Sequence, residues 1–168
     1  TGCTLELSRN SGIPVYNITG TTFSGSGKLE VNSSAVANFG APISMSTKLV
    51  ANTGIINDNV GLQPGEVTIE NSGTYGGSGS PIFANGFIWT YGNLTGSGVI
   101  NVTGSATAST TNTHTISGSK ELHISGVASF NNIPMTMSGT SKLIVKSGGV
   151  LTWDASGDRL LGGTESNE

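Results

Sequence analysis

The sequence has few charged residues, one cysteine and no long apolar run. Asp, Glu, Lys and Arg make up 10% of its 168 residues, against roughly 25% in ordinary globular domains. The net charge is −3 and no basic stripe is present, so we expect no nucleic-acid partner. Cys3 alone can form neither an internal disulfide nor a cysteine-based metal site. No segment has the 18 or so consecutive apolar residues of a membrane span.

Small polar residues replace the missing charge. The chain contains 26 Gly, 23 Ser, 21 Thr and 15 Asn. No long window has apolar residues at 3.6-residue spacing, and strong helix formers are sparse, so helices are disfavoured. Low charge with many polar residues could also indicate disorder, but the regular alternation of Leu, Ile and Val argues against it.

One short phrase returns along the chain: a Gly/Ser turn, often a lysine, and then alternating apolar residues. Its copies read GSGKLEV (25–31), STKLV (46–50), GSGVINV (96–102), SGSKELHI (117–124) and SGTSKLIV (138–145). The usual step between copies is about 20 to 22 residues, with one short step before Ile100, and a period of this length is typical of a solenoid.

We therefore predict an all-β fold, a parallel β-helix of about seven or eight turns. The domain covers residues 1–161, and residues 162–168, which lack apolar side chains, form a flexible tail. One interior column is predicted to hold four leucines: Leu29, Leu49, Leu122 and Leu143. The alternative is an antiparallel β-sandwich, although the hairpin signal Asn-Gly occurs once.

Two longer segments also match each other. FGAPISMS (39–46) and NNIPMTMS (131–138) share a proline, alternating residues and a Met-Ser pair, and each leads into Lys-Leu. They lie 92 residues apart, which predicts about four turns between them.

Three phrases resemble the repeats of autotransporter passenger domains and related bacterial or viral surface β-helices. These are GSGKLEVNSSAVANF (25–39), GSGVINVTGSATAS (96–109) and SKLIVKSGGVLTW (141–153). The resemblance implies a right-handed parallel β-helix that is extracellular, on a cell or virion surface, and part of something longer. We expect a structural or adhesive, non-catalytic segment of a larger surface or fibre protein. The open ends of its solenoid need to be covered by flanking turns of the parent chain or by an oligomer partner.

The densest aromatic segment is FIWTY at residues 87–91. On a strand, Phe87, Trp89 and Tyr91 share one face. If that face points inward, the rings fill the core. If it points outward, they form a flat surface for sugar rings or a host-surface receptor. The outward orientation makes these three residues candidate ligand-binding residues, and glycan binding or host attachment the alternative function.

The segment NSGTYGGSGS at residues 71–80 is rich in Gly and Ser. This composition predicts a loop extruded from a corner of the solenoid. Tyr75 in this loop therefore joins the candidate ligand-binding residues.

A second alternative is a fragment of a polysaccharide-degrading β-helix enzyme. Such enzymes need clustered carboxylates, and here the acidic residues are dispersed, apart from Glu66 and Glu70, which could share a strand face. We expect His114 and His123 to face outward as solvated residues rather than metal ligands. The sequence thus predicts no catalytic residue, metal or cofactor.

Overall fold

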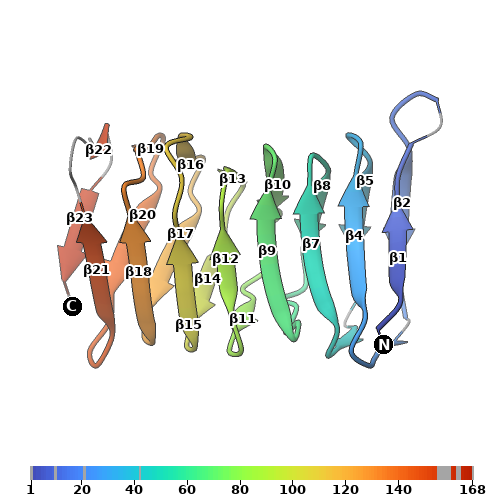
Figure 1. The fold of residues 1–168 in the computed structure, drawn as a ribbon, viewed down its shortest axis with the longest axis horizontal. Coiled ribbons are helices and arrows are strands. Elements are labelled where there is room, and N and C mark those ends of the chain that lie inside the picture. The colour runs from blue at the N-terminus through green and yellow to red at the C-terminus, as the bar shows by residue number, and fades with distance from the viewer. Residues whose placement is uncertain are drawn as a thin grey trace.

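The structure is a computed structural model that describes residues 2–9, 11–20, 22–41, 43–154, 160–161 and 164–167. These residues form strands and turns, and none of them lies in a helix. The strands stack into a parallel β-solenoid of about seven turns (Figure 1). Within the described part, no helix is long and apolar enough to cross a membrane.

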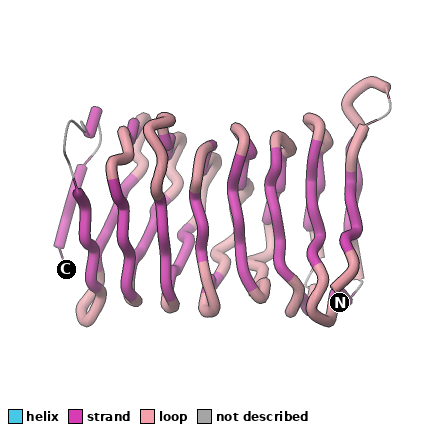
Figure 2. The backbone as a smooth tube through the Cα atoms, in the orientation of Figure 1, coloured by secondary structure: helices cyan, strands magenta, loops and turns pink. Residues whose placement is uncertain are grey.

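Each turn crosses three sides of the solenoid, which we call its first, second and third walls (Figure 2). The first wall contains β1 (Thr4–Leu7), β4 (Lys28–Asn32), β7 (Lys48–Asn52), β9 (Glu66–Glu70), β12 (Phe87–Trp89), β15 (Ser105–Ala108), β18 (Val127–Asn131) and β21 (Val150–Asp154). The second wall contains β2 (Val15–Ile18), β5 (Val36–Phe39), β8 (Ile55–Asp58), β10 (Gly73–Gly76), β13 (Gly92–Leu94), β16 (His114–Ile116), β19 (Met135–Met137) and β22 (Leu160–Leu161).

The third wall is interrupted. It begins with the pair β3 (Thr22–Phe23) and β6 (Ser44–Met45). It resumes with β11 (Ile82–Phe83), β14 (Val99–Val102), β17 (Glu121–Ile124), β20 (Lys142–Val145) and β23 (Thr164–Asn167). Between the two sheets, residues 59–65 cross this side of the solenoid without forming a strand.

Every pairing between these strands is parallel, from β1 with β4 in the first turns to β20 with β23 in the last. This confirms the predicted β-helix and excludes the antiparallel sandwich. In Figure 1 the chain climbs the near wall, crosses over the top to the far side and advances from right to left. That path is right-handed, as parallel crossovers normally are.

Alternating residues of each strand point inward and form the core. Leu29 pairs with Leu49, and Leu49 pairs with Val67, so these turns take 20 and 18 residues. Leu122 pairs with Leu143. All four predicted leucines are buried, but the prediction of one column was wrong, because the first pair lies in the first wall and the second pair in the third.

The short interval in the repeat before Ile100 also arises because the matched phrases lie in different walls. The apolar series follows the first wall as far as Trp89 in β12, and Ile100 belongs to β14 in the third wall. The two long matching segments also differ by a wall, since Phe39 lies in β5 of the second wall and the corresponding Asn131 in β18 of the first. Similar phrases therefore serve different walls, because each wall needs the same alternation of inward and outward residues.

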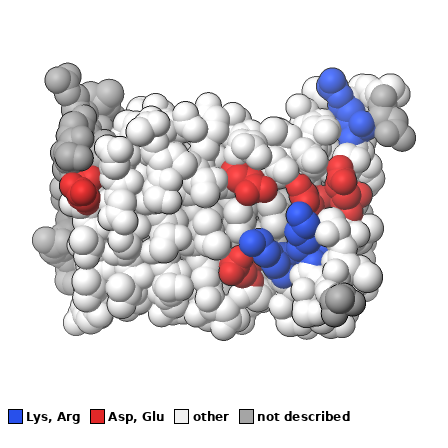
Figure 3. Space-filling view, in the orientation of Figure 1, with Lys and Arg blue, Asp and Glu red and all other residues white. Residues whose placement is uncertain are grey.

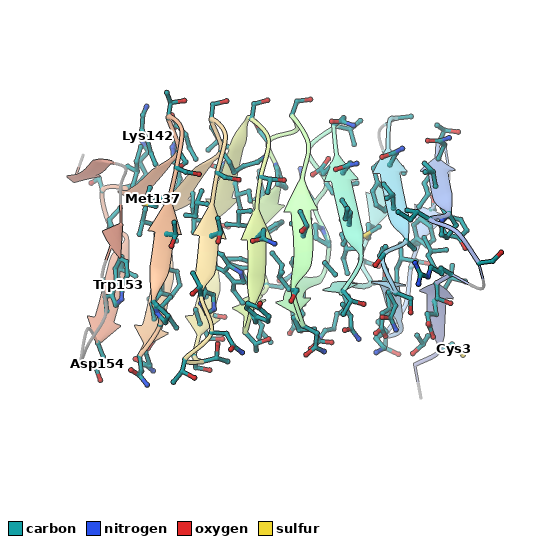
Figure 4. All side chains as sticks on the ribbon, turned by 90° about the horizontal axis from the view of Figure 1, so that it is seen from above. Cys3, Met137, Lys142, Trp153 and Asp154 are labelled. Carbon is teal, nitrogen blue, oxygen red and sulfur yellow. The ribbon has the colours of Figure 1, made fainter. Side chains whose placement is uncertain are left out.

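The two ends of the described solenoid differ from its middle. Leu5 is in register with Leu29, yet 52% of its surface is exposed, because β1 is the edge strand of the first wall among the described residues. At the other end Trp153 packs against the core, and Figure 4 shows Asp154 on the outer side of the first wall. Thr164–Asn167, part of the predicted tail, pairs with β20, and residues 162, 163 and 168 lie outside the described residues.

Candidate functional site: outer face of the first wall

The aromatic segment faces inward. Phe87 and Trp89 are buried, with 1% and 0% of their surfaces exposed. Phe87 stacks on Trp89 with ring centroids 6.0 Å apart, and the Phe83 ring lies 5.3 Å from that of Phe87. Tyr91 is half-buried beyond the end of β12. Of the two orientations open from the sequence, the structure has the inward one, so Phe87 and Trp89 present no surface on which a sugar ring could lie.

Residues 71–80 do not form the predicted extruded loop. Gly73–Gly76 is the strand β10, and Tyr75 on it is fully buried. A Cβ atom on Gly73 would lie 2.0 Å from the carbonyl oxygen of Ala51 in the preceding turn. The glycines of this segment thus allow close stacking of backbones rather than mobility, and Tyr75, like Phe87 and Trp89, is a core residue.

A buried carboxylate occupies the corner where the third wall is interrupted. Asp58 Oδ1 accepts hydrogen bonds from the backbone N–H groups of Val60 and Gly61, at 2.9 and 2.8 Å. Asp58 Oδ2 accepts from the N–H of Leu62 at 2.9 Å and from the Tyr75 hydroxyl at 2.8 Å. The carboxylate therefore supplies the acceptors that a neighbouring strand would otherwise provide for this segment. Burial, followed by the charge of Asp58, raises the pKa of Tyr75.

Lys120 extends along the same corner and is fully buried. Its Nζ donates to the carbonyl oxygen of Gly77 at 2.8 Å and to that of Ser97, so one side chain bridges successive turns. Burial lowers the pKa of Lys120 to about 8, and the negative charge of Asp58 opposes that shift. The cluster of Asp58, Tyr75 and Lys120 is enclosed, and we assign it to holding the corner.

The two histidines have different environments. His114 was predicted to face outward and is instead fully buried against Trp89. His123 lies on the outer side of the third wall, half-buried, with its Nε2 2.8 Å from Glu121 Oε2. Glu121 also binds Lys142 at 2.7 Å, and these two contacts, led by the lysine, lower the pKa of Glu121.

The outer face of the first wall divides into a part with several charges and a largely uncharged part (Figure 3). The charged part lies over β4, β7 and β9, where Lys28 binds Glu30 at 2.5 Å and Lys48 binds Glu66 at 2.7 Å. The hydrogen bond from Lys28, and then one from Asn52, lower the pKa of Glu30. These contacts pair both lysines, and Glu6 and Glu70 lie close enough to attract Lys28 as well, so the charged band carries more glutamates than lysines.

The second part extends over β12, β15, β18 and β21, and it carries one charge, that of Asp154 at the end of β21. We call its uncharged residues the neutral strip. Its residues alternate with the buried inward ones of the same strands. They are Ile88, Ser105, Thr107, Val127, Ser129, Val150 and Thr152. Thr107, Ser129 and Thr152 stack on three successive turns, beside Val127 and Val150, which are 61% and 51% exposed.

The neutral strip is the flat surface that these elements offer to a partner. It combines hydroxyl groups with β-branched methyl groups on rigid, register-locked strands. Within the described residues, no three His, Cys, Asp or Glu side chains are grouped so that they could hold a metal ion.

The chain matches no family model, no curated protein and no solved structure. The class of the protein therefore rests on its fold alone, which is a parallel β-solenoid. This fold is compatible with the resemblance to β-helix repeats.

Sequence reasoning missed the neutral strip and the buried corner. Thr107, Ser129 and Thr152 are separated by 22 and 23 residues, so their stacking follows once the register is known. The corner has no such signal, because Asp58, Tyr75 and Lys120 follow no common spacing and come together through an interruption of the third wall.

Proposed function

We propose that this chain is a non-catalytic, structural and adhesive segment of an extracellular surface or fibre protein. The observation that carries the proposal is the contrast along the first wall, where the charged band gives way to the neutral strip. The stacked turns form a rod with a continuous apolar core, and that rod holds the strip rigid and flat. The low charge and the repeat resemblance support an extracellular location.

The chemistry of the strip selects the class of partner. With no charge on its residues, it has no electrostatic attraction for an acidic or basic polymer. Its hydroxyl groups can exchange hydrogen bonds, and its valines can contact apolar faces. A neutral, hydroxyl-rich polysaccharide surface offers both kinds of contact, so we propose it as the adhesive partner.

The size of the strip argues against a protein partner held by this surface alone. From the spacing of strands and of residues along them, four strands with two outward rows cover about 200 Å². Stable protein interfaces bury about 800 Å² on each partner. A small contact of this kind gains strength when many copies act together, as they do on a fibre or a cell surface.

Two observations favour adhesion over hydrolysis. Glu66 is paired with Lys48, and Glu30 with Lys28, so these carboxylates neutralise lysines. Asp58 is enclosed and bound by four donors, which leaves it no route to a substrate.

A flow-chamber experiment tests the proposal. Bacteria that display the chain on a surface anchor would be passed over glass coated with a neutral glucan, and the attached cells counted. We expect cells with the chain to be retained at least about tenfold better than cells with the anchor alone, given multivalent contact. Equal retention would remove the adhesive function.

A further inference from the structure

The interruption of the third wall leaves a hollow on that side of the solenoid. The hollow lies between β6 and residues 59–65 and has a volume of about 350 Å³, near the lower end of the range for small-molecule sites. The described residues that line it are all uncharged, so the hollow has no attraction for a charged ligand. They are Ile43, Ser44, Met45, Ser46, Val60, Gly61 and Gln63.

The edge of β6 presents backbone groups to this hollow. In a parallel sheet, alternate residues of a strand form their hydrogen bonds with opposite neighbours. Ser46 N–H donates to Phe23 O in the preceding turn at 3.0 Å, so the backbone groups on this side of the strand face β3. Met45 precedes Ser46, and its N–H and C=O therefore face the hollow, while its side chain is buried in the core.

Residues 59–65 do not use these two groups. The N–H groups of Val60, Gly61 and Leu62 bind the Asp58 carboxylate instead. Other backbone hydrogen bonds hold the segment to adjacent turns, namely Asn59 N–H to Phe39 O, Gly65 N–H to Thr47 O and Ile82 N–H to Leu62 O. Among the described residues, no backbone hydrogen bond joins this segment to Met45. One donor and one acceptor at the edge of the sheet are thus available to a ligand.

We propose that the hollow binds one residue of a neutral sugar through two adjacent ring hydroxyl groups. The N–H and C=O of Met45 lie close together on one side of the strand. Of two adjacent hydroxyl groups, one can accept from the N–H while the other donates to the C=O. The half-buried Ile43 and Val60 offer apolar contact to the C–H groups of the ring, and the exposed side chains of Ser44 and Gln63 can bond further hydroxyls.

A peptide strand fits this edge less well than a sugar. Peptides that add to a sheet gain their affinity from a ladder of main-chain hydrogen bonds. Here β6 contains two residues, and Thr47 O, the next acceptor on that side, is already bound to Gly65 N–H. The open edge is therefore one residue long, which suits a single ring. This site lies in the third wall, so it does not depend on the adhesive role proposed for the neutral strip of the first.

Binding of methyl β-glucoside, followed through the amide signals of the isotope-labelled protein, tests the site. We expect the Met45 amide signal to move and to reach a plateau as the sugar is added. Hydroxymethyl tetrahydropyran, which has the same ring without adjacent ring hydroxyls, should bind at least about tenfold more weakly, because a hydrogen bond to Met45 is lost. The proposal would be overturned by an unmoved Met45 signal, by equal binding of the two compounds, or by tighter binding of adenine, which also carries an adjacent donor and acceptor.

Two matched variants locate the binding. Ser44 is exposed at the hollow, and Ser119 is exposed outside it, before β17. Ser44→Phe should cover the hollow and weaken binding of methyl β-glucoside at least about tenfold, because the ring no longer reaches Met45, whereas Ser119→Phe should leave it unchanged. Equal weakening by both variants, or by neither, would contradict this location. If Ser44→Phe does not fold, the comparison of the two compounds on the unchanged chain decides.

A third variant separates this site from the neutral strip. Thr107→Lys with Ser129→Lys alters the strip and not the hollow, so it should bind methyl β-glucoside as the unchanged chain does. Loss of sugar binding in this variant would place the sugar on the strip and overturn the assignment to the hollow.

Discussion

The imidazole of His114 stands edge-on against the indole of Trp89, with ring centroids 4.8 Å apart and an angle of 81° between the planes. His114 Nε2 also lies 2.8 Å from the carbonyl oxygen of Trp89. A carbonyl can only accept, so Nε2 carries the proton. This pair links β12 in the first wall to β16 in the second, across the core of the solenoid.

His114 gives the stability a pH dependence. Burial lowers the pKa of His114 below its ordinary value of 6.5, and its backbone hydrogen bonds oppose the shift. The unfolded chain then takes up a proton that the folded chain resists, so the free energy of unfolding should fall as pH decreases from 7.5 through 6.5 to 5.5. Urea unfolding at these values measures the change.

His123 provides the matched control for that experiment. It is half-buried on the outer side of the third wall and binds Glu121. His114→Leu should weaken the fall in stability between pH 7.5 and 5.5, while His123→Gln should retain it. The reverse order would show that the buried imidazole is not the group responsible.

Trp89→Ala should remove a large part of the core. The side chain is fully buried and touches both Phe87 and His114, so we expect a loss of about 3–5 kcal/mol in the free energy of unfolding. In a Trp153→Phe background, iodide should barely quench the remaining fluorescence of Trp89. Strong quenching, with an unchanged melting temperature in Trp89→Ala, would place this ring at the surface.

The repeat could be predicted from sequence because inward and outward residues alternate along every strand. GSGKLEV and SGTSKLIV both obey that rule, although the first forms β4 in the first wall and the second forms β20 in the third. The repeated sequence phrase predicts that inward and outward residues alternate, but it does not predict which wall the strand joins. That is why the burial of Leu29 and Leu143 was predicted correctly and their common column was not.

Lys120 should make the protein more stable at moderately alkaline pH. Burial lowers its pKa to about 8 in the folded chain, below the ordinary value of 10.5. The folded chain therefore binds fewer protons between these values, and stability should rise from pH 7.5 to 9.5 by on the order of 2 kcal/mol. The pH range of this prediction ends at 9.5 because Tyr75 has a raised pKa. Above about pH 10 its ionisation in the unfolded chain lowers the stability as pH rises.

Lys120→Met tests this attribution by urea unfolding at the same two pH values. The methionine keeps an extended side chain without a titrating amine, so its stability should change much less between pH 7.5 and 9.5. A variant that kept the full wild-type increase would assign the effect to another group.

Gly73→Ala should destabilise the solenoid through backbone contact. The added Cβ would lie 2.0 Å from Ala51 O and 2.9 Å from Glu70 O, neither of which can move without breaking a ladder. We expect a loss of more than about 2 kcal/mol in thermal or urea unfolding, because backbone clashes rank among the severe classes of substitution. Gly40→Ala, where nothing lies within 4 Å, should change stability little, and equal effects would contradict the stacking account.

The segment containing Gly73 also shows a limit of composition as a guide. Gly and Ser are common in flexible loops and also where backbones stack closely, and the sequence does not distinguish the two. Tyr75 was predicted at a loop and lies in the core because β10 passes between β8 and β13. Aromatic side chains fill the interior of this solenoid. The alternation within one strand does not show which of its two faces points toward that interior.

The most direct test of the adhesive account compares two pairs of lysine substitutions on displayed cells in the flow chamber coated with a neutral glucan. Thr107→Lys with Ser129→Lys places two charges on adjacent turns of the neutral strip, and Thr115→Lys with Thr136→Lys does the same on the second wall, on residues that are also in register. With display levels matched, the account predicts that the first pair reduces retention at least about tenfold, because a buried unpaired charge is costly, and that the second pair leaves it unchanged. Equal retention by the two variants would contradict the assignment of the neutral strip as the binding surface.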